Sequence, residues 1–413
     1  MKENAYLSVE TEPQLRQYCQ QIIDNPEMTW IAIDTEFVRV DTYFSELSLV
    51  QIQDCFGEMA IIDPILILQS AERSNKGNAD GTDNSVNSHN SHQPLQPLIA
   101  LLCDPNTLKV FHSGRQDIEV LYQLDDKMPS SIFDTQIATL FLKHGEMAGL
   151  ARVVKEELDV IIDKSQTRTN WHHRPLTAEQ IEYALDDVRY LAPLYEHCLK
   201  ALSPAQLTAV AQDCEKMLDP ALYTPDPENA GAKVKGIKGL KPKQLAMVNT
   251  LATWREVFAI TQNQPKKWVL DDEAIINIAK RPPITLEALY KVPHIKSSSV
   301  KLYGEQWVAL IDAVFQQSAD DWPKPEVKIA TPSPQEEALL QLCMAFVQQV
   351  AIDYQLNLHS ITNRTDLLTL LRSDEPIEKL STGWRNVLIG QDLMRLKSGE
   401  RSLKIHQGSV CLL

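Results

Sequence analysis

An apolar run leads directly into two acidic residues in the segment Trp30-Ile31-Ala32-Ile33-Asp34-Thr35-Glu36-Phe37. The run is short enough for a buried β-strand and is bounded by polar residues. Asp34 and Glu36 are two positions apart, so in a strand both side chains project from the same face. Carboxylates held this close repel each other unless a cation lies between them, and Mg²⁺ and Mn²⁺ prefer oxygen ligands. The segment is therefore either a metal site or a solvated turn after a strand.

The composition indicates a globular protein of two or three domains. The chain has 413 residues and a mass of 46.7 kDa, with 44% hydrophobic and 23% charged residues. Its net charge of −15 argues against a protein that coats nucleic acid by bulk attraction, but not against an enzyme that holds nucleic acid locally. Seven scattered cysteines without a CxxC pair argue against zinc and disulfides. With no apolar run of membrane-spanning length, we expect a cytoplasmic protein without membrane contact.

Changes in composition predict how the chain is divided. Residues 70–93 are rich in Ser, Asn, Gly and His and almost free of apolar residues, which is typical of a disordered surface insertion. Pro and Gly are frequent at 219–243, and Pro again at 321–334, as expected of linkers. The predicted division is a first domain at 1–218, a basic linker at 219–243, a helical domain at 244–320, a linker at 321–334 and a helical domain at 335–413.

A third acid follows a second predicted strand. Leu108–His112 is the strand, and Ser113-Gly114 opens a helix that carries Asp117 in its first turns. The residues His112, Gly114 and Asp117 form an H-x-G-x-x-D pattern. This places a further carboxylate just after a strand end, where it could join the first two.

A fourth acid lies on a later helix, which begins at the T-x-x-Q capping box Thr177–Gln180. Tyr183 and Asp187 are four positions apart and share a helix face. Asp186 points about a hundred degrees away from Asp187, so spacing selects only one of the two for any given face. Packing and solvent exposure would also explain the Tyr–Asp pair taken alone.

The three patterns together resemble those of the DEDD exonucleases, in the tyrosine subclass: D-x-E on a strand, H-x-G-x-x-D at a helix start and Y-x-x-x-D on a later helix. Further segments are similar to the ribonuclease D family, at 132–137, 158–165 and 175–180 and around Trp171. The two C-terminal blocks resemble the tandem helicase-and-RNase-D C-terminal domains. The likeness covers nearly the whole chain, and the insertion at 70–93 departs from it.

The resemblance implies a fold, a reaction and a set of site residues. The fold is an α/β exonuclease domain with a mixed, ribonuclease H-like sheet flanked by helices, followed by two small all-α domains. The reaction is metal-dependent 3′–5′ trimming of tRNA precursors and other structured RNA, which releases nucleoside 5′-monophosphates. Two divalent ions, Mg²⁺ or Mn²⁺, would be held by Asp34, Glu36, Asp117 and Asp187, while Tyr183 orients the attacking water. We expect a monomer.

Two other functions remain open from the sequence. A 3′–5′ DNA exonuclease would use the same chemistry, and the helical blocks disfavour it only weakly. A non-catalytic RNA-binding protein could retain the fold, although the presence of all five motif residues argues against a degenerate site.

Local contacts to RNA are predicted around the acids. Basic and aromatic residues in the loop 163–174 could meet phosphates and stack on a base, and polar residues beside Asp117 could touch substrate. The candidate substrate-binding residues are His112, Gln116, Lys164, Arg168, Trp171 and Arg174. The alternative is that they are ordinary solvated residues and a packed Trp. The lysines of the linker 219–243 would give a sequence-independent contact, or merely a polar linker.

Overall fold

The structure is a computed structural model that describes residues 6–78, 92–142, 144, 147–324, 330–375 and 377–413. It forms two compact units. One contains Met1–Phe37, Leu47–Leu222 and Ala330–Leu413, and the other contains Val38–Glu46 and Tyr223–Ile329. The last helical block therefore shares a unit with the first part of the chain.

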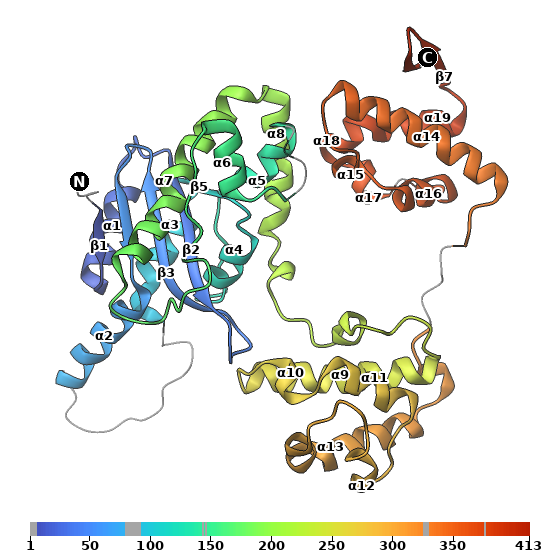
Figure 1. Ribbon diagram of the computed structural model, residues 1–413, viewed down its shortest axis with the longest axis horizontal. Coiled ribbons are helices and arrows are strands. Elements are labelled where there is room, and N and C mark those ends of the chain that lie inside the picture. The colour runs from blue at the N-terminus through green and yellow to red at the C-terminus, as the bar shows by residue number, and fades with distance from the viewer. Residues whose placement is uncertain (1–5, 79–91, 143, 145–146, 325–329, 376) are drawn as a thin grey trace. The chain divides into compact units, whose positions relative to one another are not determined.

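Six strands within the described residues form one mixed sheet in the first unit, in the order β1-β4-β3-β2-β5-β6 (Figure 1). The strands are β1 (Leu7–Val9), β2 (Trp30–Val38), β3 (Glu46–Asp54), β4 (Met59–Ile62), β5 (Leu108–Phe111) and β6 (Ile132–Asp134). The pairs β1–β4, β2–β5 and β5–β6 are parallel, and β3–β4 is antiparallel. The apolar run Ile31–Ile33 is fully buried in β2, as expected of an interior strand covered on both faces.

Helices flank this sheet, and α7 carries the last of the four predicted acids, Asp187. The helices are α1 (Glu12–Ile23), α2 (Pro64–Asn78), α3 (Gln96–Cys103), α4 (Arg115–Tyr122), α5 (Thr135–Ala138), α6 (Leu150–Leu158), α7 (Ala178–Ala201) and α8 (Pro204–Glu215). The predicted capping box at the start of α7 is present, with Thr177 and Gln180 bonded reciprocally. Tyr195 of α7 packs edge-on against Trp30 and Phe133, with ring centroids 5.1 and 5.0 Å apart. These contacts fix α7 against the strands β2 and β6.

Helix α2 extends into the segment expected to be disordered. Residues 70–78 belong to this helix, and the hydroxyls of Ser70 and Ser74 donate to the carbonyl oxygens of Ile67 and Ser70 over 2.8 and 3.0 Å. A helix nucleated in an apolar segment propagates at low cost into polar residues, which explains the difference from the expectation. Gln93–Leu95 form a 3₁₀ turn, and residues 79–91 lie outside the described part of the chain.

The second unit is helical, with one segment drawn from the connection between β2 and β3. The α-helices among its described residues are α9 (Pro242–Thr261), α10 (Lys266–Val269), α11 (Asp272–Lys280), α12 (Leu286–Leu289) and α13 (Ser297–Gln316). They enclose a core around the fully buried Trp307. The Tyr43 hydroxyl donates to Glu256 Oε1 over 2.6 Å, and Asn263 Oδ1 accepts from the Tyr43 backbone N–H. The connection 38–46 is thus bonded to α9 and the residues that follow it.

The last block packs on α8 within the first unit. It contains α14 (Pro334–Asp353), α15 (Leu358–Ile361), α16 (Arg364–Arg372), α17 (Glu378–Ser381), α18 (Gly383–Arg385) and α19 (Gln391–Ser398). Asp213 of α8 accepts hydrogen bonds from Trp384 Nε1 and Arg385 Nη1, both over 2.9 Å. Because neither Asp213 nor Arg385 is more than 14% exposed, this ion pair is shielded from water and anchors the block.

The expectation of an all-α final domain is wrong at its C-terminal end. The strands β7 (Leu403–His406) and β8 (Ser409–Leu412) form an antiparallel hairpin. Gln407 and Gly408 form the two-residue turn, and both have positive φ, of 49° and 81°. A two-residue turn in which both residues have positive φ has a backbone twist that matches the twist of the two paired strands. The alternating pattern of Leu403–His406 was a sequence signal for this element.

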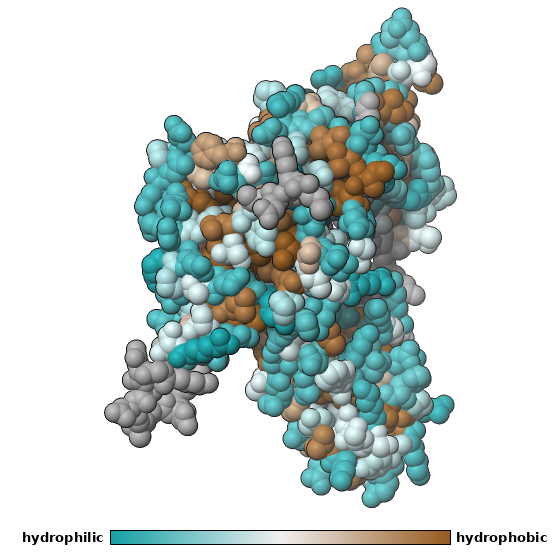
Figure 2. Space-filling view, turned by 60° about the vertical axis from the view of Figure 1, so that its left-hand side comes forward, coloured by the Kyte–Doolittle hydropathy of each residue, from teal (hydrophilic) through white to brown (hydrophobic). Residues whose placement is uncertain are grey.

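Polar residues cover much of the one face of the molecule that Figure 2 draws. On the face drawn in Figure 2, the apolar residues gather in separate patches between polar ones. Among the described residues, no helix combines the length and the apolar character needed to cross a membrane.

Candidate active site

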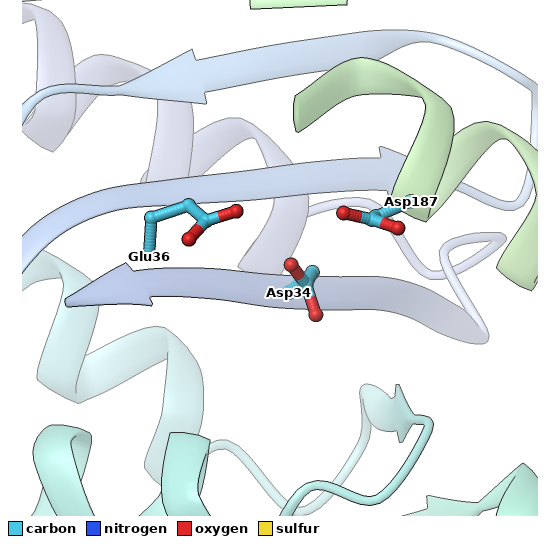
Figure 3. A group of neighbouring side chains, drawn as sticks. All are labelled: Asp34, Glu36 and Asp187. Carbon is cyan, nitrogen blue, oxygen red and sulfur yellow. The ribbon is translucent and has the colours of Figure 1, made fainter. Parts of the chain in front are cut away.

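Three carboxylates converge between β2 and α7. Asp34 and Glu36 project from the same side of β2, and Asp187 reaches them from α7 (Figure 3). One oxygen of each carboxylate lies within 4.8 Å of an oxygen of the other two, and no other such group of three ligating residues occurs in the described residues. This is the arrangement expected from the two-residue spacing of Asp34 and Glu36 on the strand and from the position of Asp187 in the Y-x-x-x-D motif.

Asp117 lies beside this cluster at the start of α4. It is only 9% exposed, and the Thr35 hydroxyl donates to its Oδ1 over 2.6 Å. The turn before α4 is held by Asp134, whose carboxylate accepts from the backbone N–H groups of Ser113 and Gly114 over 3.0 and 2.8 Å. Ser113 adopts the left-handed conformation, with φ of 62°. These bonds place Asp117 in the first turn of α4, facing β2.

Burial raises the pKa of every acid in the site. The pKa of Glu36 is raised to about 9 by burial and by repulsion from Asp187 and Asp117. Burial is also the main cause of the raised pKa of Asp187, which is about 7. It likewise raises the pKa of Asp117 to about 6, although the hydrogen bond from Thr35 opposes this rise. The pKa of Asp34 lies well above its ordinary value. One buried and three half-buried carboxylates held this close ionise together readily only if cations neutralise them, so this donor set fits divalent metal ions.

Tyr183 lies one turn before Asp187 on α7, and its hydroxyl is 3.2 Å from Thr167 Oγ1. Burial, and next the charge of Asp187, raise the pKa of the phenol to about 12. The phenol is therefore neutral near pH 7, which favours a role in orienting water over one as a base.

The adjacent acid Asp186 points elsewhere. Its carboxylate is paired with Arg189, which also binds Glu182 over 2.7 Å. This pairing stabilises α7 on the side away from the cluster, and it makes Asp186 a natural control for Asp187.

Three of the residues predicted to touch substrate are exposed near the site. Gln116 lies in the first turn of α4, and Lys164 and Arg168 lie in the loop before α7. The positive charge of Lys164 opposes the rise in the pKa of Asp187, which places its ammonium group near the acids. These side chains are available to bind phosphate oxygens.

His112 is committed to contacts within the protein. Its Nδ1 lies 2.9 Å from Thr135 Oγ1 and its Nε2 lies 2.8 Å from the carbonyl oxygen of Ala148. Burial lowers the pKa of the imidazole. Because both ring nitrogens are occupied, the ring positions the end of β5 and does not offer a nitrogen to substrate, contrary to the prediction.

Trp171 and Arg174 are also structural, which corrects their predicted contacts with a base and a phosphate. Trp171 is 2% exposed and packs against the Tyr183 ring at a centroid distance of 5.9 Å. Arg174 donates to both carboxylate oxygens of Asp63, over 2.5 and 3.1 Å, and to the carbonyl oxygens of Ser48 and Trp171. Every guanidinium nitrogen is bonded, so none is left for RNA.

The Arg174→Ala variant is expected to be destabilised by about 3 kcal/mol, because it leaves the buried carboxylate of Asp63 unpaired. The matched control is Arg168→Ala in the same loop, where an exposed side chain is removed and the expected change is below about 0.5 kcal/mol. Urea unfolding of the metal-free proteins measures both. Equal stabilities for the two variants would contradict the role given to Arg174.

Sequence reasoning missed three residues that support the site. Thr35 holds Asp117, and Asp63 holds Arg174, but no periodic pattern marks either contact. The Asp134-Thr135 pair does signal a helix start, and Asp134 accepts from the Gln136 N–H as an N-cap. Its further bonds to the turn before α4 depend on the pairing of β5 with β6, which the sequence alone does not reveal.

Comparison with known families agrees with this geometry. Residues 6–203 match a family model described as a 3′-5′ exonuclease, and residues 244–311 match the HRDC domain model. The family match therefore places the mixed sheet in a 3′–5′ exonuclease domain, and the acids on its interior strand and on α7 could hold a metal ion.

Relatives identify the family. The chain is 32% identical to ribonuclease D of Acidiphilium cryptum over 96% of this chain and 94% of the relative, and 30% identical to that of Zymomonas mobilis over 93% and 92%. The crystal structure of Escherichia coli RNase D aligns with a TM-score of 0.79 at 27% identity, covering 96% and 99% of the two chains. The chain belongs to the ribonuclease D family and is a 3′–5′ exoribonuclease. This confirms the predicted reaction over the DNA exonuclease and the non-catalytic RNA-binding protein.

Proposed function

We propose that this exoribonuclease trims the 3′ ends of structured RNA, such as tRNA precursors, and releases nucleoside 5′-monophosphates. The acidic cluster beside Tyr183 is the observation that supports the proposal, because carboxylates that can hold metal ions fit the metal-assisted hydrolysis of a phosphodiester. The Escherichia coli relative, described as an exoribonuclease involved in structured RNA processing, supports the substrate class. We further propose a monomeric, cytoplasmic enzyme.

Four residues would hold two divalent ions, Mg²⁺ or Mn²⁺, namely Asp34, Glu36, Asp117 and Asp187. When bound, the ions would supply Lewis-acid chemistry for the attacking water and for the negative charge on the leaving oxygen. The protein fixes the carboxylates in advance: two by the strand β2, one by α7, and one by α4 with the hydrogen bond from Thr35. Pre-organised ligands avoid the cost of rearrangement during the reaction.

RNA would be held by exposed residues at the rim of this site. Lys164 and Arg168 would bind phosphate oxygens, and Gln116 would contact the terminal nucleotide. Lysines of the linker 219–243 would add a contact that is independent of sequence and weakens with salt. We propose the domain division 1–218, 244–320 and 335–413, with the first part carrying the chemistry and the two helical parts binding RNA.

The substrate is tested by incubating the enzyme with a tRNA precursor that has a 3′ extension, an unstructured RNA of the same length and the matched single-stranded DNA. Mg²⁺, Mn²⁺ and EDTA are compared. The proposal expects mononucleotide release from the precursor that stops near the mature end, and none in EDTA. Preference for the DNA, or indifference to RNA structure, would contradict the proposed substrate.

Tyr183→Phe is expected to lower kcat by about 10²-fold with little change in KM, because it removes the hydroxyl that orients the water but leaves the acids and the ring packing against Trp171 in place. Single-turnover rates on the precursor measure the effect. Tyr190→Phe on the same helix is the control and should retain full activity. A rate for Tyr183→Phe equal to that of the wild type would rule out the role.

A further inference from the structure

The hydroxyl of Tyr183 has one neighbour within hydrogen-bond distance in the described residues, the Thr167 hydroxyl at 3.2 Å. Thr167 Oγ1 also lies 3.0 Å from the carbonyl oxygen of Lys164. Thr167 therefore stands between a phenol, which can donate or accept, and a carbonyl, which only accepts.

The direction of these two bonds follows from the supply of protons. A threonine hydroxyl has one proton, and the carbonyl oxygen of Lys164 has none to give. The Thr167 hydroxyl therefore donates its one hydrogen bond to the Lys164 carbonyl oxygen, and the lone pairs of Thr167 Oγ1 remain free to accept a hydrogen bond. The Tyr183 hydroxyl is then the donor, in a chain that runs from Tyr183 through Thr167 to the Lys164 carbonyl.

The loop that carries Thr167 is fixed to the start of α7. Gln180, part of the capping box, donates from Nε2 to Thr169 Oγ1 over 3.2 Å. Asp163 accepts from both the backbone N–H and the hydroxyl of Ser165. With the Tyr183 ring packed on Trp171, the main remaining freedom of the phenol is the rotation of its O–H bond, and Thr167 sets that rotation.

We propose that Thr167 is a positioning residue for Tyr183, an inference that rests on the proposed role of Tyr183 toward water. By accepting a hydrogen bond from the phenol, Thr167 turns the lone pairs of the Tyr183 oxygen toward the site. The attacking water then donates to that oxygen and keeps its own lone pair free for phosphorus. A phenol that donated to the water would instead occupy the lone pair that must attack.

Thr167→Val removes the acceptor at nearly constant volume, and Thr167→Ser keeps it. We expect Thr167→Val to lower kcat about tenfold, as for loss of one hydrogen bond, with KM unchanged, and Thr167→Ser to remain within about twofold of the wild type. In the Tyr183→Phe background, Thr167→Val should have no further effect. RNA affinity measured by fluorescence anisotropy in EDTA and the melting temperature should stay the same in all variants.

Three results would overturn the inference. The first is wild-type kcat for Thr167→Val. The second is an equal loss in the Tyr183→Phe background, since the Thr167 hydroxyl would then act on another group. The third is weaker RNA binding by Thr167→Val in EDTA, which would make Thr167 a substrate contact. Thr167→Ala serves as a second variant in each comparison, because Thr167 is exposed and its truncation should not disturb folding. Full activity of Tyr183→Phe would instead refute the proposed role of Tyr183, and this result is separate from the three that concern Thr167.

Discussion

Asp187→Asn is expected to lower kcat for RNA hydrolysis by about 10³-fold, because it removes one of the converging charges that would hold the metal ions and leaves the backbone of α7 unchanged. The loss should be smaller at high Mn²⁺, since added metal partly compensates for weaker binding. Single-turnover rates across a range of metal concentrations separate the loss of affinity from the loss of rate.

Asp186→Asn is the matched control, being the same substitution one residue away. Asp186 is paired with Arg189 and does not belong to the cluster, so this variant should retain activity within about twofold and lose at most about 1 kcal/mol of stability. An equal loss of activity in the two variants would contradict the assignment of Asp187. A loss confined to Asp186→Asn would transfer the assignment to that residue.

Metal-free protein is expected to become less stable as the pH rises. The pKa values of Asp117, Asp187 and Glu36 are about 6, 7 and 9 in the folded protein, against about 4 in an unfolded chain. Below about pH 4 these acids are protonated in both the folded and the unfolded state, and their favourable contribution to the free energy of unfolding is fully present. Between about pH 4 and pH 9 the unfolded chain loses these protons first, so the folded state is progressively destabilised.

The melting temperature in EDTA should therefore fall by roughly 5 °C or more between about pH 5.5 and pH 8.5. Mg²⁺ or Mn²⁺ should restore it at the higher pH, because the ions bind only the folded cluster. Asp187→Asn provides the control, since removing one acid should reduce the dependence on pH. A melting temperature that does not change with either pH or metal would show that the acids are not mutually repulsive.

Local sequence patterns predicted the parts of the site that depend on spacing. The apolar run before Asp34 and Glu36 became the interior strand β2, and the T-x-x-Q box began α7 at the expected residue. The Y-x-x-x-D motif of the resembling family, and not helix spacing alone, selected Asp187 over Asp186, and the structure brings Asp187 to the strand acids. Strand alternation explains why Asp34 and Glu36 share a face, whereas the approach of Asp187 from α7 was expected from the family resemblance.

Contacts between distant segments were beyond such reasoning. Arg174 and Trp171 have the composition of an RNA-binding loop, yet Arg174 binds Asp63 from the end of β4 and Trp171 packs under Tyr183. The distinction between a buried and an exposed arginine, Arg174 against Arg168, depends on which carboxylate folding brings near. Likewise, nothing in the polar residues 70–78 reveals that a helix started upstream continues through them.

The most direct test of the acidic cluster as a 3′-end hydrolase is to identify the products released from an RNA with a free 3′-hydroxyl and from the same RNA with its 3′ end blocked. With Mg²⁺, the free RNA should yield nucleoside 5′-monophosphates one at a time, and the blocked RNA should yield none. Asp187→Asn should release no product in the same period, whereas Asp186→Asn should match the wild type. Internal fragments, nucleoside 3′-phosphates or equal cleavage of the blocked RNA would contradict the account.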